Sequence, residues 1–231
     1  MTSLGGARPR TWQLPKTGRH SDAQRERLVV GRQGIFARDL SIAGYELLFR
    51  SPGRVGLRID LWNSTQQDRA TEHVIATAFH REVDIAPGID TFINFTRGYL
   101  LSNSDLACDP ERVVIEVVES AFADDDLRQR LADLRAEGFR VAIDDFIGTR
   151  NQVALLGEAD YVKIDYRDLS ARGPSLADFA RGSGAILVAE RVETRIQLQE
   201  CVDLGFTLFQ GHALEPAITI HVGDEARVHG P

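Results

Sequence analysis

Two adjacent aspartates, Asp144 and Asp145, follow a short apolar run at residues 141–143, within the stretch FRVAIDDFIGTRNQ. Neighbouring side chains on a strand point to opposite faces, so one site can use both acids only where the strand ends and the chain starts to turn. Two like charges this close also need a cation to neutralise them. The pair therefore indicates metal chemistry at the end of a buried strand.

Nearly every other predicted strand carries one polar side chain within its apolar run or at its end. These residues are Glu46, Asn94, Glu116, Lys163, Glu190 and Gln210. In an α/β barrel the carboxyl ends of the strands converge on one mouth, where active sites lie. The sequence therefore predicts a ring of carboxylate, amide and lysine side chains that face one another.

So many carboxylates cannot share one mouth unpaired, because like charges a few Å apart keep some of them protonated. Mg²⁺ or Mn²⁺ ions remove this repulsion, since both accept oxygen ligands. Two such ions about 3.5–4 Å apart support in-line attack on a phosphodiester, and one aspartate of the pair could bridge them. Taken singly, Glu116 could be a paired core acid and Asp145 could cap a turn. The complete set favours a two-metal site.

Alternating strand and helix patterns must position these side chains. The runs at residues 28–36 and 41–50 are separated by a turn-prone segment and predict a hairpin. We then expect strands at residues 90–96, 112–120, 139–145, 161–165, 185–193 and 206–214. We expect helices at residues 66–83, 124–137, 151–158, 176–182 and 194–204.

The unit of helix, glycine, phenylalanine and buried strand occurs twice, as LADLRAEGFRVAIDD and LQECVDLGFTLFQGH. Nearly continuous apolar strands that alternate with helices indicate parallel βαβ units covered on both faces. No glycine-rich phosphate loop follows the first strand, which weakens the alternative of an open, doubly wound nucleotide-binding fold. The pattern therefore favours the α/β class, as a barrel rather than an open doubly wound sheet.

The chain has 231 residues, of which 43% are hydrophobic and 26% are charged, as in an ordinary globular protein. An α/β barrel commonly takes about 200–250 residues as one domain. We expect a flexible N-terminal tail at residues 1–27, a barrel domain at residues 28–220 and a C-terminal tail at residues 221–231.

The charge and the cysteines exclude several classes of protein. The net charge of −7 does not indicate a basic surface that would bind duplex nucleic acid. No apolar stretch reaches the ~18 residues of a membrane-spanning helix. Cys108 and Cys201 show neither a disulfide framework nor zinc-site spacing, and two lone thiols fit a reducing cytosol. We therefore expect a cytoplasmic protein that binds neither duplex nucleic acid nor a membrane.

The ordered segments carry a resemblance to a known family. GYELLFR, FINF, VVIEVVES, GFRVAIDDF, YVKID, VAERVET and FQG stand in the order and spacing of the EAL-domain family, over about residues 29–216. The spellings ELL and AERVET are most similar to the EAL part of EAL-HDOD proteins. The resemblance implies a TIM-like (β/α)8 barrel with an antiparallel first strand, and hydrolysis of cyclic di-GMP to linear pGpG with two Mg²⁺ or Mn²⁺ ions. It also implies a homodimer, and regulation would need this dimer, a regulatory protein partner, the N-terminal tail or the expression level.

The resemblance also implies a role for each residue of the site. The metal ligands would be Glu46, Asn94, Glu116, Asp144 and Asp145, with Asp144 bridging the two ions. The catalytic residues would be Lys163, which would contact the metal-bound water, and Glu190, Glu193 and Gln210. Cyclic di-GMP would contact Gln33, Leu48 and Arg50, the last through a phosphate. Glu119 would anchor the loop that follows the two aspartates.

Departures from the family pattern lie around this set. Residues 146–153 read FIGTRNQV, where the family usually has Phe-Gly-x-Gly-Tyr-Ser-Ser-Leu. Arg191 replaces the usual glycine, His212 replaces a tyrosine, and Glu215 stands where a lysine is typical. These changes put substrate affinity and turnover in question more than metal binding. The alternative is therefore a weak or inactive domain that binds cyclic di-GMP or a protein partner. A third hypothesis is a barrel enzyme acting on another phosphorylated or carboxylated substrate.

Overall fold

The fold is taken from a computed structural model of the chain. It describes residues 28–50, 63–79, 85–86 and 88–222. The expected N-terminal tail at residues 1–27 lies outside the described residues, and so do residues 223–231 of the expected C-terminal tail.

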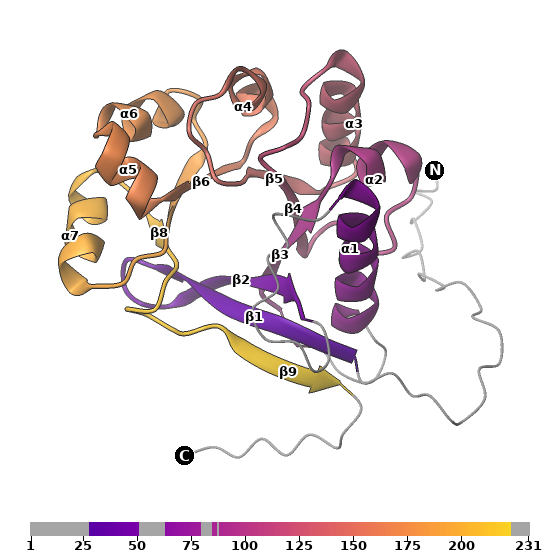
Figure 1. Cartoon of the computed structure of the whole chain (residues 1–231), viewed down its shortest axis with the longest axis horizontal. Coiled ribbons are helices and arrows are strands. Elements are labelled where there is room, and N and C mark those ends of the chain that lie inside the picture. Colours follow the sequence, from indigo (N-terminus) through magenta and orange to yellow (C-terminus); the bar gives the residue numbers. More distant parts are fainter. Residues whose placement is uncertain (1–27, 51–62, 80–84, 87, 223–231) are drawn as a thin grey trace, which may run out of the picture.

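Eight strands close into a barrel (Figure 1). β1 (Leu28–Ala37) pairs antiparallel with β2 (Ile42–Phe49), as the predicted hairpin requires. The parallel strands that follow are β3 (Asp90–Phe95), β4 (Val113–Val117), β5 (Arg140–Ile143), β6 (Tyr161–Asp165), β7 (Ile186–Glu190) and β8 (Leu208–Phe209). β8 pairs antiparallel with the end of β1, which closes the ring. The predicted TIM-like barrel with an antiparallel first strand is confirmed.

Helices surround the ring of strands on its outer side (Figure 1). They are α1 (Ser64–Ala78), α2 (Arg97–Ser102), α3 (Asp125–Ala136), α4 (Arg150–Leu155) with the 3₁₀ turn η2 (Leu156–Glu158), α5 (Tyr166–Arg172), α6 (Ser175–Arg181) and α7 (Arg195–Asp203). The side chains of Asn63, Asp124, Thr149 and Thr194 each accept a hydrogen bond from a backbone N–H in the first turn, which fixes where four of these helices begin. Among the described residues no helix combines the length and the apolar character needed to cross a bilayer.

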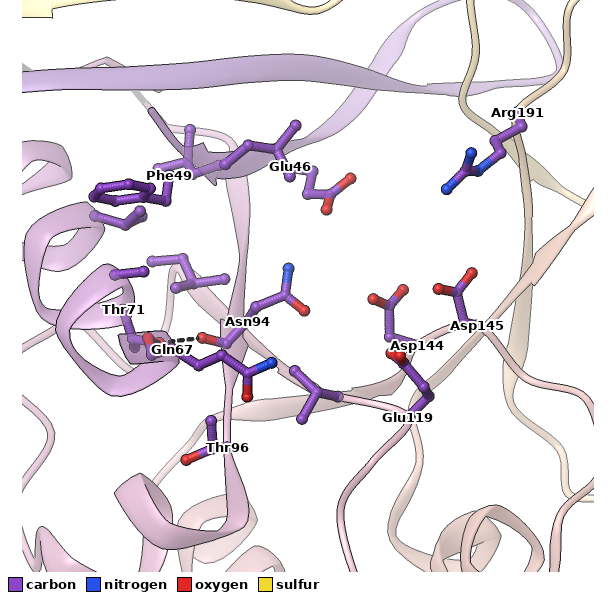
Figure 2. A pocket seen from close by; sticks show the side chains of 16 residues that line it. Glu46, Phe49, Gln67, Thr71, Asn94, Thr96, Glu119, Asp144, Asp145 and Arg191 are labelled. Carbon is purple, nitrogen blue, oxygen red and sulfur yellow. Dashed lines mark hydrogen bonds between the residues drawn. The ribbon is translucent and has the colours of Figure 1, made fainter. Parts of the chain in front are cut away.

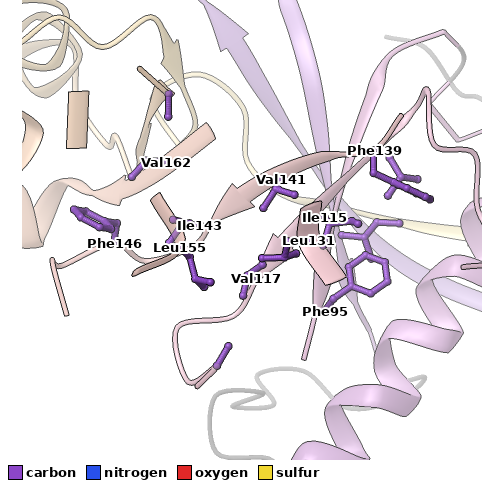
Figure 3. Close-up of a cluster of buried hydrophobic side chains, with 14 of the residues drawn as sticks. Phe95, Ile115, Val117, Leu131, Phe139, Val141, Ile143, Phe146, Leu155 and Val162 are labelled. Atoms are coloured by element: carbon purple, nitrogen blue, oxygen red, sulfur yellow. The ribbon is translucent and has the colours of Figure 1, made fainter. Parts of the chain in front are cut away.

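The core between strands and helices is apolar and fully buried (Figure 3). Ile115 and Val117 of β4 point outward from the barrel and pack in one cluster with Leu131 of α3 and Phe95 of β3. Burying side chains of this size stabilises the fold by about 1.5–3 kcal/mol each. This outer core holds each strand at a fixed height in the barrel, and so fixes the height of the residues that point inward.

Three elements were not predicted from the sequence: α2, α5 and the strand β9 (Ile218–Val222). β9 pairs with residues 28–32 of β1, on the same edge that β8 occupies at Phe36 and Ala37. Because β8 is only two residues long, it leaves the first half of that edge unpaired, and β9 fills it. Two residues of the expected C-terminal tail, His221 and Val222, thus belong to a strand.

Candidate active site

On the six strands β3 to β8, an inward-facing apolar residue lies two positions before a polar residue of the site that stands on the strand or directly after it. The pairs are Phe92 and Asn94, Val114 and Glu116, Ala142 and Asp144, Tyr161 and Lys163, Val188 and Glu190, and Leu208 and Gln210. The apolar members form a cluster of their own, separate from the outer core. Because side chains alternate between the two faces of a strand, the polar members form the next layer of the barrel interior, towards the carboxyl ends.

Lys163 is the centre of this polar layer and is fully buried. Its Nζ lies 2.6 Å from Glu116 Oε1, 2.9 Å from Glu190 Oε1, 3.1 Å from Asp144 Oδ1 and 3.6 Å from Glu46 Oε2. These four carboxylates come from β2, β4, β7 and the end of β5. The barrel therefore brings together the residues that the sequence predicted to face one another.

Gln210 joins the first strands to the last one. Its amide nitrogen donates to Glu46 Oε2 at 2.6 Å and to Gln33 Oε1 at 3.2 Å. Gln33 lies directly opposite Glu46 in the register of the hairpin. The antiparallel hairpin thus orients the Glu46 carboxylate, which faces Lys163 from one side and the Gln210 amide from the other.

The electrostatics of the layer are dominated by burial and by excess negative charge. Burial opposes the charged form of Lys163, but Asp144, Glu116, Glu190 and Glu46 outweigh this effect and hold the pKa of the lysine well above its ordinary value. Burial also raises the pKa of Glu116 well above its usual range, because Lys163 offsets only part of the cost of its charge. Lys163 is therefore an ammonium ion, and its one positive charge offsets only part of the negative charge of its acidic neighbours.

Two further acids are held partly protonated near neutral pH. Burial raises the pKa of Glu190 to about 8, with Asp144 and Glu46 adding to the rise and Lys163 opposing it. Burial, followed by repulsion from Asp144, raises the pKa of Asp145 to about 6. The layer contains more carboxyl groups than one lysine neutralises, so an added divalent cation would displace protons from it.

Several oxygen atoms of the layer fit a metal by their chemistry. Glu116 Oε2 and Gln210 Oε1 are buried and accept no hydrogen bond among the described residues, while Glu116 Oε1 and Asp144 Oδ1 have only the Lys163 ammonium beside them. Unpartnered carboxylate and amide oxygens are the ligands that Mg²⁺ and Mn²⁺ take. In the described part of the chain, no group of three or more His, Cys, Asp or Glu side chains is arranged to hold an ion; the carboxylates turn to Lys163 instead.

The backbone places the two aspartates between β4 and β6. The amide of Asp144 donates to the carbonyl of Val117 at 3.3 Å, and the amide of Phe146 donates to the carbonyl of Lys163 at 2.9 Å. Asp145 between them has a left-handed backbone with φ +42°. This turn, which the adjacency of the two acids predicted, lets both carboxylates face the same cavity (Figure 2).

Three cavities open at the carboxyl ends of the strands and meet around Asp145. One, of about 280 Å³, lies between Glu46, Asn94 and the two aspartates. A second cavity, of about 340 Å³, is lined by six further predicted site residues: Gln33, Leu48, Arg50, Glu190, Glu193 and Gln210. A third, of about 240 Å³, extends from Asp145 towards α5. Every predicted site residue except the buried Glu116 and Lys163 lines at least one of them.

The loop after the aspartates is held by Gln152, a residue that the sequence analysis did not single out. Its buried amide nitrogen donates to the carbonyls of Asp145 at 2.8 Å and Asp144 at 3.3 Å. Its amide oxygen accepts from the backbone N–H of Ile147 and of Thr149. Thr149 and Gln152 form a capping box, and the Thr-x-x-Gln spacing was the signal available in the sequence.

Glu119, the predicted anchor of this loop, lies beside Asp145 and lines two of the cavities (Figure 2). It makes no hydrogen bond or ion pair with the described residues of the loop, whereas Gln152 makes several. Its anchoring role stays a prediction.

Comparisons with known proteins agree on one family. Residues 21–217 match the sequence model of the EAL domain. The chain is 30% identical over 201 residues to the uncharacterized protein YuxH of Bacillus subtilis strain 168, which covers 83% of this chain and 48% of YuxH. It is 31% identical over 210 residues to the cyclic di-GMP phosphodiesterase CdgJ of Vibrio cholerae, which covers 87% of this chain and 47% of CdgJ. The chain thus spans about half the length of the curated relatives it matches.

Among solved structures, the fold is similar to that of the Bacillus subtilis YkuI protein, which has an EAL domain and is in complex with its substrate c-di-GMP and calcium. The TM-score is 0.67 and the sequences are 25% identical, over 82% of this chain and 55% of YkuI.

The raised pKa of Glu190 predicts how the stability of the metal-free protein depends on pH. Since its folded pKa of about 8 lies above the ordinary value of 4.5, Glu190 gains a proton on folding. Its contribution to the free energy of unfolding is complete below about pH 4.5 and is lost as the pH rises through about 8. In urea titrations with a chelator present, Glu190→Gln should therefore show a smaller loss of stability from pH 5 to 9 than the wild type. Glu193→Gln, at an exposed position, should keep the wild-type slope, and equal slopes for Glu190→Gln and wild type would contradict the assignment.

Gln152→Ala should destabilise the fold, because it leaves the carbonyls of Asp144 and Asp145 and two loop amides without their partner. A loss of about 2–3 kcal/mol in the free energy of unfolding is expected from urea titration. Gln199→Ala removes a single exposed bond to Asp203 on α7 and should change stability by less than about 0.5 kcal/mol. Equal stabilities of the two variants would show that Gln152 does not hold the loop.

Proposed function

Because the chain belongs to the EAL domain family, we propose that it hydrolyses cyclic di-GMP to linear pGpG with the help of two Mg²⁺ or Mn²⁺ ions. The observation that carries the proposal is the buried layer in which Lys163 contacts Glu46, Glu116, Asp144 and Glu190. The activity in the name of CdgJ and the complex of YkuI with c-di-GMP and calcium support the same substrate and the use of a divalent ion.

The metal ligands in this proposal are Glu46, Asn94, Glu116, Asp144 and Asp145. When bound, the ions would offset the charge of the phosphodiester and supply a nucleophilic water at neutral pH. Gln210 fixes the direction of the Glu46 carboxylate through its 2.6 Å hydrogen bond. The backbone turn at Asp145 sets the two aspartates on one side of the cavity.

Proton transfer in this proposal belongs to Glu190, supported by Lys163. Glu190 lines the cavity proposed for the dinucleotide and lies beside Lys163, a position that suits a group that takes or returns a proton during hydrolysis. The Lys163 ammonium, 2.9 Å away, stabilises the carboxylate form when the proton leaves. As a cation beside the proposed metal ligands, Lys163 would also favour deprotonation of the attacking water. Glu193, at the exposed rim of the same cavity, would support Gln210.

The cavity of about 340 Å³ is the proposed binding site for the dinucleotide. Gln33 and Leu48 line it on the side of the hairpin, and Arg50 brings a guanidinium whose planar fork suits a phosphate. Glu119 would contribute to the order of the neighbouring loop.

A second candidate is binding of cyclic di-GMP without hydrolysis. It is favoured by Ile147, which stands where the family has a glycine, and by Glu215, which stands where the family has a lysine. The homodimer implied by the resemblance, a regulatory protein partner and the cytoplasmic location expected from the cysteines stay predictions.

The proposal is tested by incubating the purified protein with cyclic di-GMP and Mn²⁺ and separating the products by chromatography. Wild-type protein should release pGpG, and Glu46→Gln should lower the rate at least ~100-fold, since it weakens a metal ligand without changing its size. Glu137→Gln, at the exposed end of α3, should keep the wild-type rate.

No pGpG from a high concentration of folded wild-type protein would contradict hydrolysis. Tight binding of cyclic di-GMP without product would then select the second candidate, and no binding at all would exclude both.

A further inference from the structure

Arg191 stands directly after Glu190 and lines all three cavities of the site. Its backbone has φ +51°, in the left-handed region that residues with a Cβ atom adopt at a cost. Its side chain is 58% exposed, so packing of the side chain offsets little of this cost. A strained residue with an exposed arginine at a barrel mouth points to a function for the side chain.

The strain at Arg191 is imposed by the next residues of the chain. The amide of Val192 donates to the carbonyl of Gln210 at 3.0 Å, and the carbonyl of Val192 accepts from the amide of Ala213 at 3.0 Å. Gly211 packs so closely that a Cβ atom there would lie 2.2 Å from the Val192 carbonyl oxygen. The backbone at residue 191 is therefore fixed, and its side chain leaves the strand in one direction.

A buried carboxylate holds the Arg191 guanidinium in place. Arg191 Nε lies 3.0 Å from Asp165 Oδ2, and Asp165 is 2% exposed. Asp165 is already paired without it: the backbone N–H of Arg167 donates to Asp165 at 2.8 Å and the Arg167 guanidinium binds both carboxylate oxygens. The second arginine is thus not needed to satisfy Asp165. The ion pair orients Arg191, whose two terminal nitrogens make no hydrogen bond within the described residues.

Few cations line the two larger cavities at Arg191, whereas the third is also lined by Arg167. Its guanidinium lies across the open space from Asp144 and Asp145 (Figure 2). Besides Arg191 and the carboxylates, two ionisable side chains among the described residues line the cavities of about 280 and 340 Å³, namely Arg50 and His212. Glu215 stands where the family has a lysine, and its carboxylate is turned away to the amide of Gly34 at 2.9 Å. An anionic ligand therefore meets few cations here other than Arg191.

We propose that Arg191 binds a phosphate of the cyclic dinucleotide through its terminal guanidinium nitrogens, with Asp165 and Arg167 holding it in position. The inference rests on the proposed function and adds to it a ligand-binding residue at a position where the family usually has a glycine. The planar guanidinium fork offers two parallel N–H donors to a phosphate, which a lysine at the same position cannot match.

Arg191→Gly separates this role from a structural one. Glycine adopts φ +51° without strain, so the variant should unfold at the same temperature as the wild type or higher. Loss of a charge-assisted bond to phosphate should weaken binding of cyclic di-GMP by about 10-fold or more. Arg191→Lys should recover part of the affinity. Arg128→Ala, on the exposed face of α3 and outside all three cavities, is the matched control and should bind as the wild type does.

The experiment is calorimetric titration of each full-length variant with cyclic di-GMP in Ca²⁺, together with KM in Mn²⁺ and a thermal unfolding curve. Weaker binding by Arg191→Gly at equal or higher thermal stability supports the inference. Equal affinity of Arg191→Gly and wild type overturns it and leaves the proposed function intact. A joint loss of affinity and stability also overturns it, since that is the signature of a structural role. Absence of cyclic di-GMP binding by the wild type overturns both proposals.

Discussion

The burial of one ammonium ion among four carboxylates is the constraint on which the rest of the structure depends. Lys163 is fully enclosed, so its charge is tolerated only because Glu46, Glu116, Asp144 and Glu190 surround it. Ion clusters of this kind are a poor means of stabilising a fold, because desolvation consumes most of the attraction. The presence of such a cluster in the centre of a barrel is therefore best explained by chemistry, namely an affinity for cations.

The position of this layer was predictable because it follows from the pleat. Once a strand is buried on both faces, its inward residues recur every second position, and a polar residue two places after an inward apolar one must lie one layer higher. Glu116 after Val114 and Lys163 after Tyr161 show the pattern in the sequence itself. The barrel class, the hairpin and the convergence of the acids could be predicted on this basis, since each depends on local periodicity.

The features that could not be predicted depend on contacts between distant segments. β9 is a strand because β8 is too short to cover the edge of β1, and no local pattern states how far β8 extends. Gln152 binds the carbonyls of residues 144 and 145 through a loop whose path the sequence does not show. Arg191 was visible as a departure from a family pattern, but its ion pair with Asp165 and its place between three cavities required the structure.

The central claim is that this carboxylate layer holds two divalent ions next to the phosphodiester. Electron paramagnetic resonance of the protein titrated with Mn²⁺ in the presence of cyclic di-GMP tests it most directly. Two Mn²⁺ ions per chain with an exchange-coupled spectrum are predicted, because a bridging Asp144 would hold the ions about 3.5–4 Å apart. A single uncoupled ion per chain, or a signal of free Mn²⁺ that the protein leaves unchanged, would contradict the claim.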